Sequence, residues 1–251
     1  MSLYISILLT SSLALYCLYR SKLTIPAVVF GWFIGVAVGY YGGYFAFIAL
    51  FMTCVLVLIS DKVKKTKKDD TRTAFQLIGT IFVPAVCIAV YYLFEIEVFY
   101  ITYYAVLATS LGDTLSSGLG PLSKKKPINI FTLEKVEKGD SGGITTFGTI
   151  MSAFGGIIVG GIYFIQTMNI IPFIIIIILS IIGSFVDSVL GLIFQAQYRC
   201  IACKKVIEES KHCRKKAKLI RGYPYINNSL VNLMSNLAIL LISYLIFYII
   251  L

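Results

Sequence analysis

Two aspartates lie inside long apolar segments of this 251-residue chain. Ionisable side chains are costly in such segments, so each one indicates a function. Asp113 falls in an apolar block over residues 98–118, and Asp187 falls in another over 170–197. Carboxylates with nearby amide oxygens suit a hard cation such as Mg²⁺ that also contacts substrate phosphates. The same pair would also suit a proton- or sodium-coupled transporter.

Small and polar residues form stripes at helical spacing around both aspartates and on two further blocks. Small residues alone are explained by close packing of membrane helices. Close packing does not explain aspartates and asparagines that lie at one depth. Their placement favours a functional site where four helices end. The stripe residues are Thr109, Gly112, Ser116, Ser117 and Gly120; Thr145, Gly148, Ser152, Gly155 and Gly156; Ser180, Gly183, Ser184, Ser188, Gly191 and Gln195; and Asn228, Asn232, Ser235 and Asn236.

A glycine- and lysine-rich loop over residues 119–143 follows the block that contains Asp113. Glycines before a helix N-terminus let backbone N–H groups approach a phosphate, and the helix end favours negative charge. Gly142 and Gly143 stand in this position, and Lys124, Lys135 and Lys138 add point charges that bind phosphate. The loop therefore predicts phosphate binding, although it has no Walker A pattern.

Long apolar blocks must position these residues. The mean hydropathy is +0.88, and only 14% of residues are charged, compared with about 25% in ordinary soluble domains. A membrane-spanning helix needs about 17–25 mostly apolar residues. We therefore predict an all-α, polytopic transmembrane bundle that forms a single domain over 1–251. The expected spans are 2–19, 23–40, 43–60, 74–94, 98–118, 144–166, 170–197 and 226–250.

Basic residues predict the orientation of these spans. All 22 lysines and arginines fall in the loops on one side of an eight-span arrangement. The positive-inside rule places those loops in the cytoplasm and both termini outside. The first block lacks a basic leader and is followed by Arg20 and Lys22, so we expect an uncleaved helix rather than a signal peptide. The charge of +10 fits contact with anionic lipid headgroups or a polyanionic substrate, and we expect no nucleic-acid partner.

A second cytoplasmic loop over 198–225 contains Cys200, Cys203, His212 and Cys213. A C-x₂-C pair followed by two further ligands can close a tetrahedral zinc site. Four protein ligands leave no open coordination position, so the zinc would be structural. The alternative is unliganded thiols in a basic loop.

Five groups of residues form recognisable motifs: 112–117, 139–143 with 148–149, 183–184 with 187–191, 197–200, and 227–228 with 231–232. Together these motifs resemble those of a family of multi-pass membrane proteins that includes plant phytyl-phosphate kinase. The resemblance covers about residues 72–236, and such proteins are similar to CTP-dependent polyprenol kinases. The family loop usually carries threonine where this chain has Asp140.

This resemblance implies CTP-dependent phosphorylation of an isoprenoid monophosphate to the diphosphate at the cytoplasmic face. Asp113 and Asp187 would hold Mg²⁺, and Lys135 would act in catalysis. We assign substrate or nucleotide binding to Ser116, Ser117, Lys124, Lys138, Gly142, Gly143, Thr145, Ser188, Asn228 and Asn232. The alternatives are an ion-coupled transporter that uses the two aspartates and a CTP-dependent cytidylyltransferase. The D-G-x₂-A-R pattern of CDP-alcohol phosphotransferases is absent.

Overall fold

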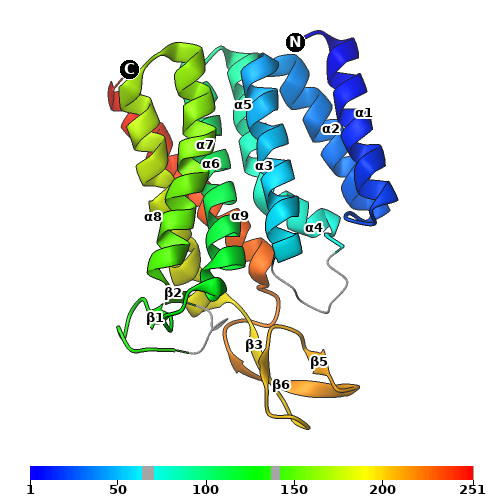
Figure 1. The fold of residues 1–251 in the computed structure, drawn as a ribbon, viewed down its shortest axis with the longest axis vertical. Coiled ribbons are helices and arrows are strands. Elements are labelled where there is room, and N and C mark those ends of the chain that lie inside the picture. The colour runs from blue at the N-terminus through cyan, green and yellow to red at the C-terminus, as the bar shows by residue number, and fades with distance from the viewer. Residues whose placement is uncertain (64–70, 137–141, 251) are drawn as a thin grey trace.

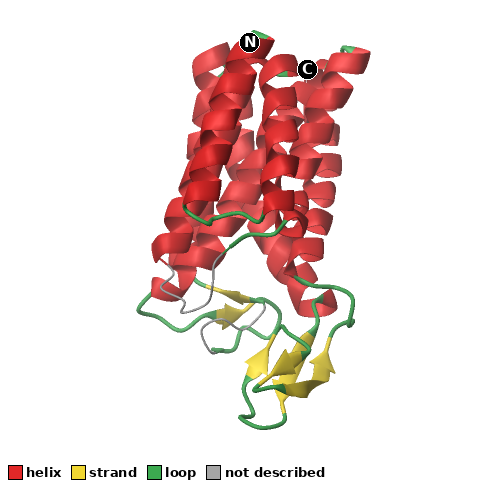
Figure 2. Ribbon diagram, turned by 90° about the vertical axis from the view of Figure 1, so that its right-hand side faces the viewer, coloured by secondary structure: helices red, strands yellow, loops and turns green. Residues whose placement is uncertain are grey.

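A bundle of long, roughly parallel helices forms the body of the protein, and small β-sheets cover one end of it (Figures 1 and 2). The computed structural model describes residues 1–63, 71–136 and 142–250. The helices are α1 (Leu3–Tyr19), α2 (Ile25–Tyr41), α3 (Gly43–Val63), α4 (Ala74–Leu77), α5 (Val83–Phe94), α6 (Glu97–Leu119), α7 (Thr146–Thr167), α8 (Ile170–Phe194) and α9 (Asn228–Ile250), with the short turns η1 (Ile78–Phe82) and η2 (Gly120–Leu122).

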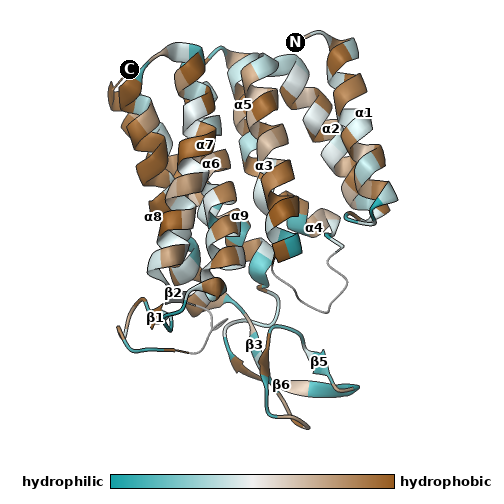
Figure 3. Ribbon diagram, in the orientation of Figure 1, coloured by the Kyte–Doolittle hydropathy of each residue, from teal (hydrophilic) through white to brown (hydrophobic). Residues whose placement is uncertain are grey.

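The described helices follow the predicted apolar blocks closely. Within the described residues, five segments are long and apolar enough to cross a membrane: 43–63, 74–94, 146–167, 170–194 and 228–250. Helices α1 and α2 have 17 residues each, which is the lower end of the spanning range. Helix α6 has 23 residues but is more polar than the others. Figure 3 shows the apolar character of the bundle and the hydrophilic character of the sheet end.

Helix α6 lies at the centre of the bundle, which explains its polarity. It packs against α3, α5, α7, α8 and α9, and most of its length is buried. A central helix is shielded from lipid, so polar side chains can find partners there. Tyr103, for example, is fully buried and donates its hydroxyl to the carbonyl of Ala46 at 2.6 Å.

A π-helical turn, η1, interrupts the segment 74–94 between α4 and α5. Pro84 has no N–H, so carbonyls one turn earlier lose their helical donor. The Asn236 amide donates to the Gly79 carbonyl at 2.9 Å, and the Ser110 hydroxyl donates to the Thr80 carbonyl at 2.8 Å. Helices α6 and α9 therefore satisfy the backbone groups that the turn leaves open.

Both termini lie at one end of the bundle, and the connections that carry the described lysines and arginines lie at the other (Figure 1). A tight turn separates the second and third helices: α2 ends at Tyr41, and Gly43 opens α3 with φ +83°. At the basic end, Arg72 forms a two-pronged pair with Asp61 at 2.8 and 2.9 Å. This pair joins the end of α3 to the segment before α4.

Strands within the two long loops are the feature that the helical prediction did not include. Strands β1 (Ile128–Asn129) and β2 (Gly143–Ile144) pair in antiparallel fashion. The second loop forms a four-stranded sheet of order β4-β3-β6-β5. Its strands are β3 (Gln197–Cys200), β4 (Val206–Ile207), β5 (Lys211–His212) and β6 (Lys215–Arg221). Backbone N–H and C=O groups in these loops lie outside the helices and still need hydrogen-bond partners. Pairing of short strands supplies them.

Candidate functional site

A cavity of about 390 Å³ opens where α6, α7, α8 and α9 meet the β-strands. Its size suits a small-molecule ligand. It brings together residues that are far apart in the chain. The lining residues are Asp113, Ser116, Ser117, Gly120, Pro121, Pro127, Gly142, Gly143, Ile144, Thr145, Asp187, Ser188, Gly191, Gln195, Glu208 and Asn228.

The two membrane aspartates both line this cavity and are close enough for their like charges to interact. Helix α9 supports Asp187 from the side. The Ser235 hydroxyl donates to Asp187 Oδ1 at 3.1 Å. The Asn232 amide, in the orientation that satisfies its neighbours, donates to the same oxygen at 3.1 Å and to the Asn228 carbonyl at 2.9 Å. One carboxylate oxygen of Asp187 is thus fixed by two donors.

Two helix N-termini reach the same cavity. Thr145 is the N-cap of α7, and its hydroxyl accepts from the Gly148 N–H at 2.9 Å. Asn228 is the first residue of α9. Helix N-termini carry partial positive charge and exposed N–H groups, so they favour anions. The cavity therefore combines carboxylates that attract a cation with two helix ends that attract an anion.

Most of the predicted cavity residues are brought together by the fold. Ser116, Ser117, Gly142, Gly143, Thr145, Ser188 and Asn228 line the cavity with the two aspartates. Asn232 does not line it, but it holds Asp187. Gly142 has φ +79°, a conformation that suits glycine at this loop position.

The predicted phosphate-binding lysines are placed differently. Lys124 and Lys135 are exposed and do not line the cavity, and Lys138 and Asp140 lie outside the described residues. Among the described lining residues there are three carboxylates and no lysine or arginine. A phosphate that entered this part of the cavity would need a cation to offset these like charges.

Other stripe residues pack helices together rather than line the cavity. The Ser180 hydroxyl contacts the carbonyls of Ala108 and Ser152, both at 2.8 Å. A Cβ on Gly155 would lie 2.7 Å from the backbone nitrogen of Gly112. The Asn236 side-chain amide donates to the Gly79 carbonyl in the π-helical turn. Close helix packing therefore accounts for these positions.

Glu208 is a cavity residue that sequence reasoning missed. It follows β4 in the second loop and is the third carboxylate of the lining. Neither helical spacing nor apolar surroundings mark it, since it lies in a polar hairpin. Only the fold of this loop over the helix ends brings Glu208 to the aspartates.

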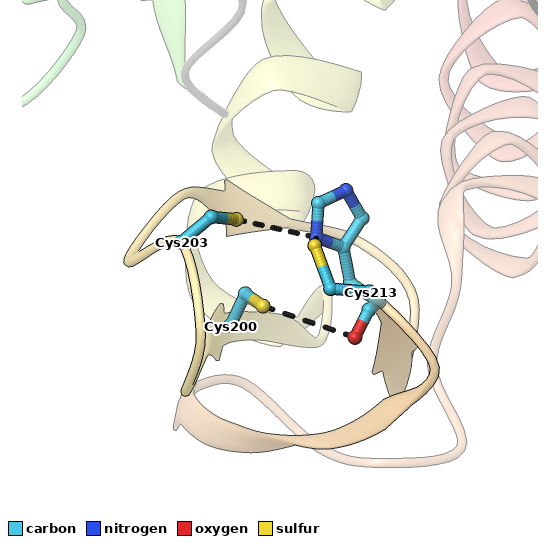
Figure 4. Close-up of side chains that lie close together, drawn as sticks. Cys200, Cys203 and Cys213 are labelled. Atoms are coloured by element: carbon cyan, nitrogen blue, oxygen red, sulfur yellow. Dashed lines mark hydrogen bonds between the residues drawn. The ribbon is translucent and has the colours of Figure 1, made fainter.

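The cysteines and the histidine of the second loop form a separate cluster (Figure 4). His212 Nδ1 lies 3.3 Å from Cys203 Sγ and 3.2 Å from Cys213 Sγ. One possible ligand atom from each of Cys200, Cys203, His212 and Cys213 falls within 4.8 Å of the others. A backbone hydrogen bond from Cys203, followed by one from the His212 side chain, lowers the pKa of Cys200 to about 6.

These features define a multi-pass α-helical membrane protein with a polar cavity at one end of its bundle. The chain belongs to the family described as integral membrane protein DUF92, which it matches over residues 8–240.

Two relatives show how far this similarity extends. The chain is 34% identical over 164 residues to an uncharacterized membrane protein of Methanocaldococcus jannaschii. This alignment covers 63% of this chain and 68% of the relative. It is 32% identical over 148 residues to Protein PGR of Arabidopsis thaliana, covering 53% of this chain and 49% of the plant protein. The match thus spans about half the length of the plant protein. No solved structure matches the chain significantly.

Proposed function

We propose that this protein is a membrane-embedded kinase that uses CTP to convert an isoprenoid monophosphate to its diphosphate. The observation that carries the proposal is the meeting of Asp113 and Asp187 with the N-termini of α7 and α9 in one cavity. The resemblance of the same motifs to phytyl-phosphate kinase and polyprenol kinases supports the choice of nucleotide and substrate. We further propose that the cavity end of the bundle faces the cytoplasm, as the basic connections indicate.

The donor set fits Mg²⁺. Carboxylate, hydroxyl and amide oxygens are hard ligands, and Mg²⁺ is commonly held by one or two carboxylates plus substrate phosphates. When bound, Mg²⁺ would neutralise charge on the transferred phosphoryl group. Asp113 and Asp187 would hold it, while Ser235 and Asn232 keep Asp187 in place. The three-carboxylate lining would in turn exclude phosphate that arrives without a cation.

The remaining cavity residues would orient the two phosphate groups. The N–H groups at the start of α7, together with the Gly142–Gly143 turn, would bind the nucleotide phosphates. Ser116 and Ser117 of α6 and Ser188 of α8 line the cavity, and their hydroxyl groups would contact the phosphates. A substrate phosphate oxygen would bond to the terminal phosphorus of CTP, the bridging P–O bond would break, and CDP would leave. An ionised substrate phosphate needs no general base.

The position of the site favours a kinase over an ion-coupled transporter. Transporter sites are expected near the bilayer midplane, at the interface of repeated helices. Here the cavity is lined by residues of the helix ends and of the loops that carry the β-strands, and these strands lie at one end of the bundle (Figure 2). Solvent-borne nucleotide can reach this position without crossing the apolar layer.

The test is an assay of purified full-length protein in detergent with Mg²⁺, geranylgeranyl or phytyl phosphate, and each of the four nucleoside triphosphates. We expect diphosphate to form with CTP, and Asp113→Asn to lower the rate at least a hundredfold. Glu97→Gln is the matched control, because Glu97 lies at the opposite end of the same helix. Absence of diphosphate with every nucleotide, or full activity of Asp113→Asn, would refute the proposal.

A further inference from the structure

The second loop contains a cluster of four soft-ligand residues contributed by two turns. Cys200 ends β3, and Cys203 lies in the turn that follows. His212 ends β5, and Cys213 follows it in the turn to β6. Figure 4 shows the thiols of Cys200, Cys203 and Cys213 close together. His212 Nδ1 lies 3.3 Å from the sulfur of Cys203 and 3.2 Å from that of Cys213. Strands β3 and β5 both flank β6 in the sheet, which brings the two turns together.

The spacing of the ligand atoms matches a tetrahedral metal site. Zinc bonds of about 2.3 Å to sulfur and 2.0–2.1 Å to nitrogen place neighbouring ligand atoms about 3.5–3.8 Å apart. The two measured sulfur–nitrogen distances are 3.3 and 3.2 Å, and all four ligand atoms lie within 4.8 Å of one another. Changes of up to about 1 Å in the distances between ligand atoms would make the four equidistant from one ion. Three thiolates and an imidazole favour zinc over magnesium or calcium.

The sheet that holds this cluster has little else to stabilise it. Strands β4 and β5 have two residues each, and most side chains from 201 to 220 are exposed. Lys204, Cys213 and Arg214 adopt left-handed backbone conformations, with φ of 60°, 50° and 59°. Such conformations are strained in residues other than glycine. Small sheets without an apolar core generally require a metal or a disulfide, and the three cysteines are free thiols.

The same sheet delivers Glu208 to the cavity. Glu208 lies between the two halves of the cluster, five residues after Cys203 and four before His212. It is the only described lining residue from the second loop. A metal ion bound by Cys203 and His212 would hold both ends of this segment and so fix the position of the Glu208 carboxylate.

We propose that Cys200, Cys203, His212 and Cys213 bind one zinc ion, and that this ion holds the β4–β5 segment so that Glu208 faces the cavity. The ion is structural, because its four protein ligands complete the tetrahedron and leave no position for substrate. This zinc site does not depend on which reaction the cavity performs.

Metal analysis of the purified full-length protein tests whether the four residues bind zinc. We expect about one zinc per chain and no iron, and loss of that zinc in Cys203→Ser. Cys17→Ala removes a thiol from α1, outside the cluster, and should keep the zinc. Wild-type protein that holds no zinc even after incubation with zinc chloride would overturn the proposal. Full zinc content in Cys203→Ser, or iron in place of zinc, would do so as well.

Hydrogen–deuterium exchange tests whether zinc holds the β4–β5 segment. It uses wild-type protein, so no variant that could misfold is needed. Removal of zinc with a high-affinity chelator should raise amide exchange at least tenfold in peptides that cover residues 197–221. Peptides from α7 and α8 should keep their protection, and re-addition of zinc should reverse the change. Unchanged exchange over 204–211 after zinc loss would show that the metal does not hold Glu208.

Discussion

Replacing Gly155 of α7 with alanine tests the helix packing that brings Asp113 into position. A Cβ there would lie 2.7 Å from the backbone nitrogen and 2.8 Å from the Cα of Gly112. These are backbone atoms, so no side-chain rotation relieves the contact. The helices α6 and α7 must separate until 2.7 Å becomes about 3.4 Å, where ordinary contacts begin. Gly161, on the same helix, has nothing within 4 Å of the point that a Cβ would occupy and is therefore a matched control.

The magnitude follows from two opposing effects. Glycine to alanine in a helix stabilises by about 0.5–1 kcal/mol at either position. Overpacking a close contact costs about 1–3 kcal/mol, and only Gly155→Ala incurs it. Gly155→Ala should therefore be about 1–3 kcal/mol less stable than Gly161→Ala. At about 2–4 °C per kcal/mol for a chain of this length, its unfolding midpoint should be lower by about 2–12 °C.

Thermal unfolding of both variants in the same detergent measures this difference. Intrinsic fluorescence and size-exclusion recovery after heating give two independent midpoints. Equal midpoints for the two variants would refute the close α6–α7 contact. Because Gly112 precedes Asp113, Gly155→Ala should also weaken Mn²⁺ binding in the cavity, whereas Gly161→Ala should leave it unchanged.

Three further substitutions test other contacts. Asp187→Asn should weaken Mn²⁺ binding, measured by electron paramagnetic resonance, at least tenfold, because the cavity loses one of its two membrane carboxylates; unchanged affinity would contradict the cation site. Asn236→Ala should destabilise the protein by about 1–3 kcal/mol, since the buried Gly79 carbonyl loses its donor, and a midpoint equal to wild type would contradict that role. Arg72→Lys should lower stability by about 1 kcal/mol, since lysine cannot form both bonds to Asp61; the loss should be absent when Asp61 is already asparagine.

Helical architecture could be predicted from the sequence because lipid imposes a simple rule. Backbone groups in an apolar layer must be satisfied within the segment, so long apolar blocks become helices. The segments 43–63, 74–94 and 228–250 follow this rule closely. The rule says nothing about a polar loop, and β3 to β6 were therefore not predicted.

The carboxylate pair could also be predicted, since Asp113 and Asp187 are costly in apolar blocks and fall at one depth. The lysines could not be assigned in the same way. Many lysines satisfy a spacing argument in a basic loop, and neither Lys124 nor Lys135 lines the cavity. A charged residue within an apolar membrane segment usually belongs to a functional site, because it is costly there without a partner. A charged residue in a water-exposed loop is stable without any such role.

The sequence by itself determined the membrane helices, the two aspartates and the ligand types of the Cys–His cluster, because each depends on local composition and short spacing. Tertiary structure alone decided which stripe residues reach the cavity and which only pack helices, as Asn228 and Asn236 illustrate. It also decided that Glu208 joins the aspartates. The physical reason is that contacts between side chains far apart in the chain depend on how helices and loops fold over one another, which no local pattern records.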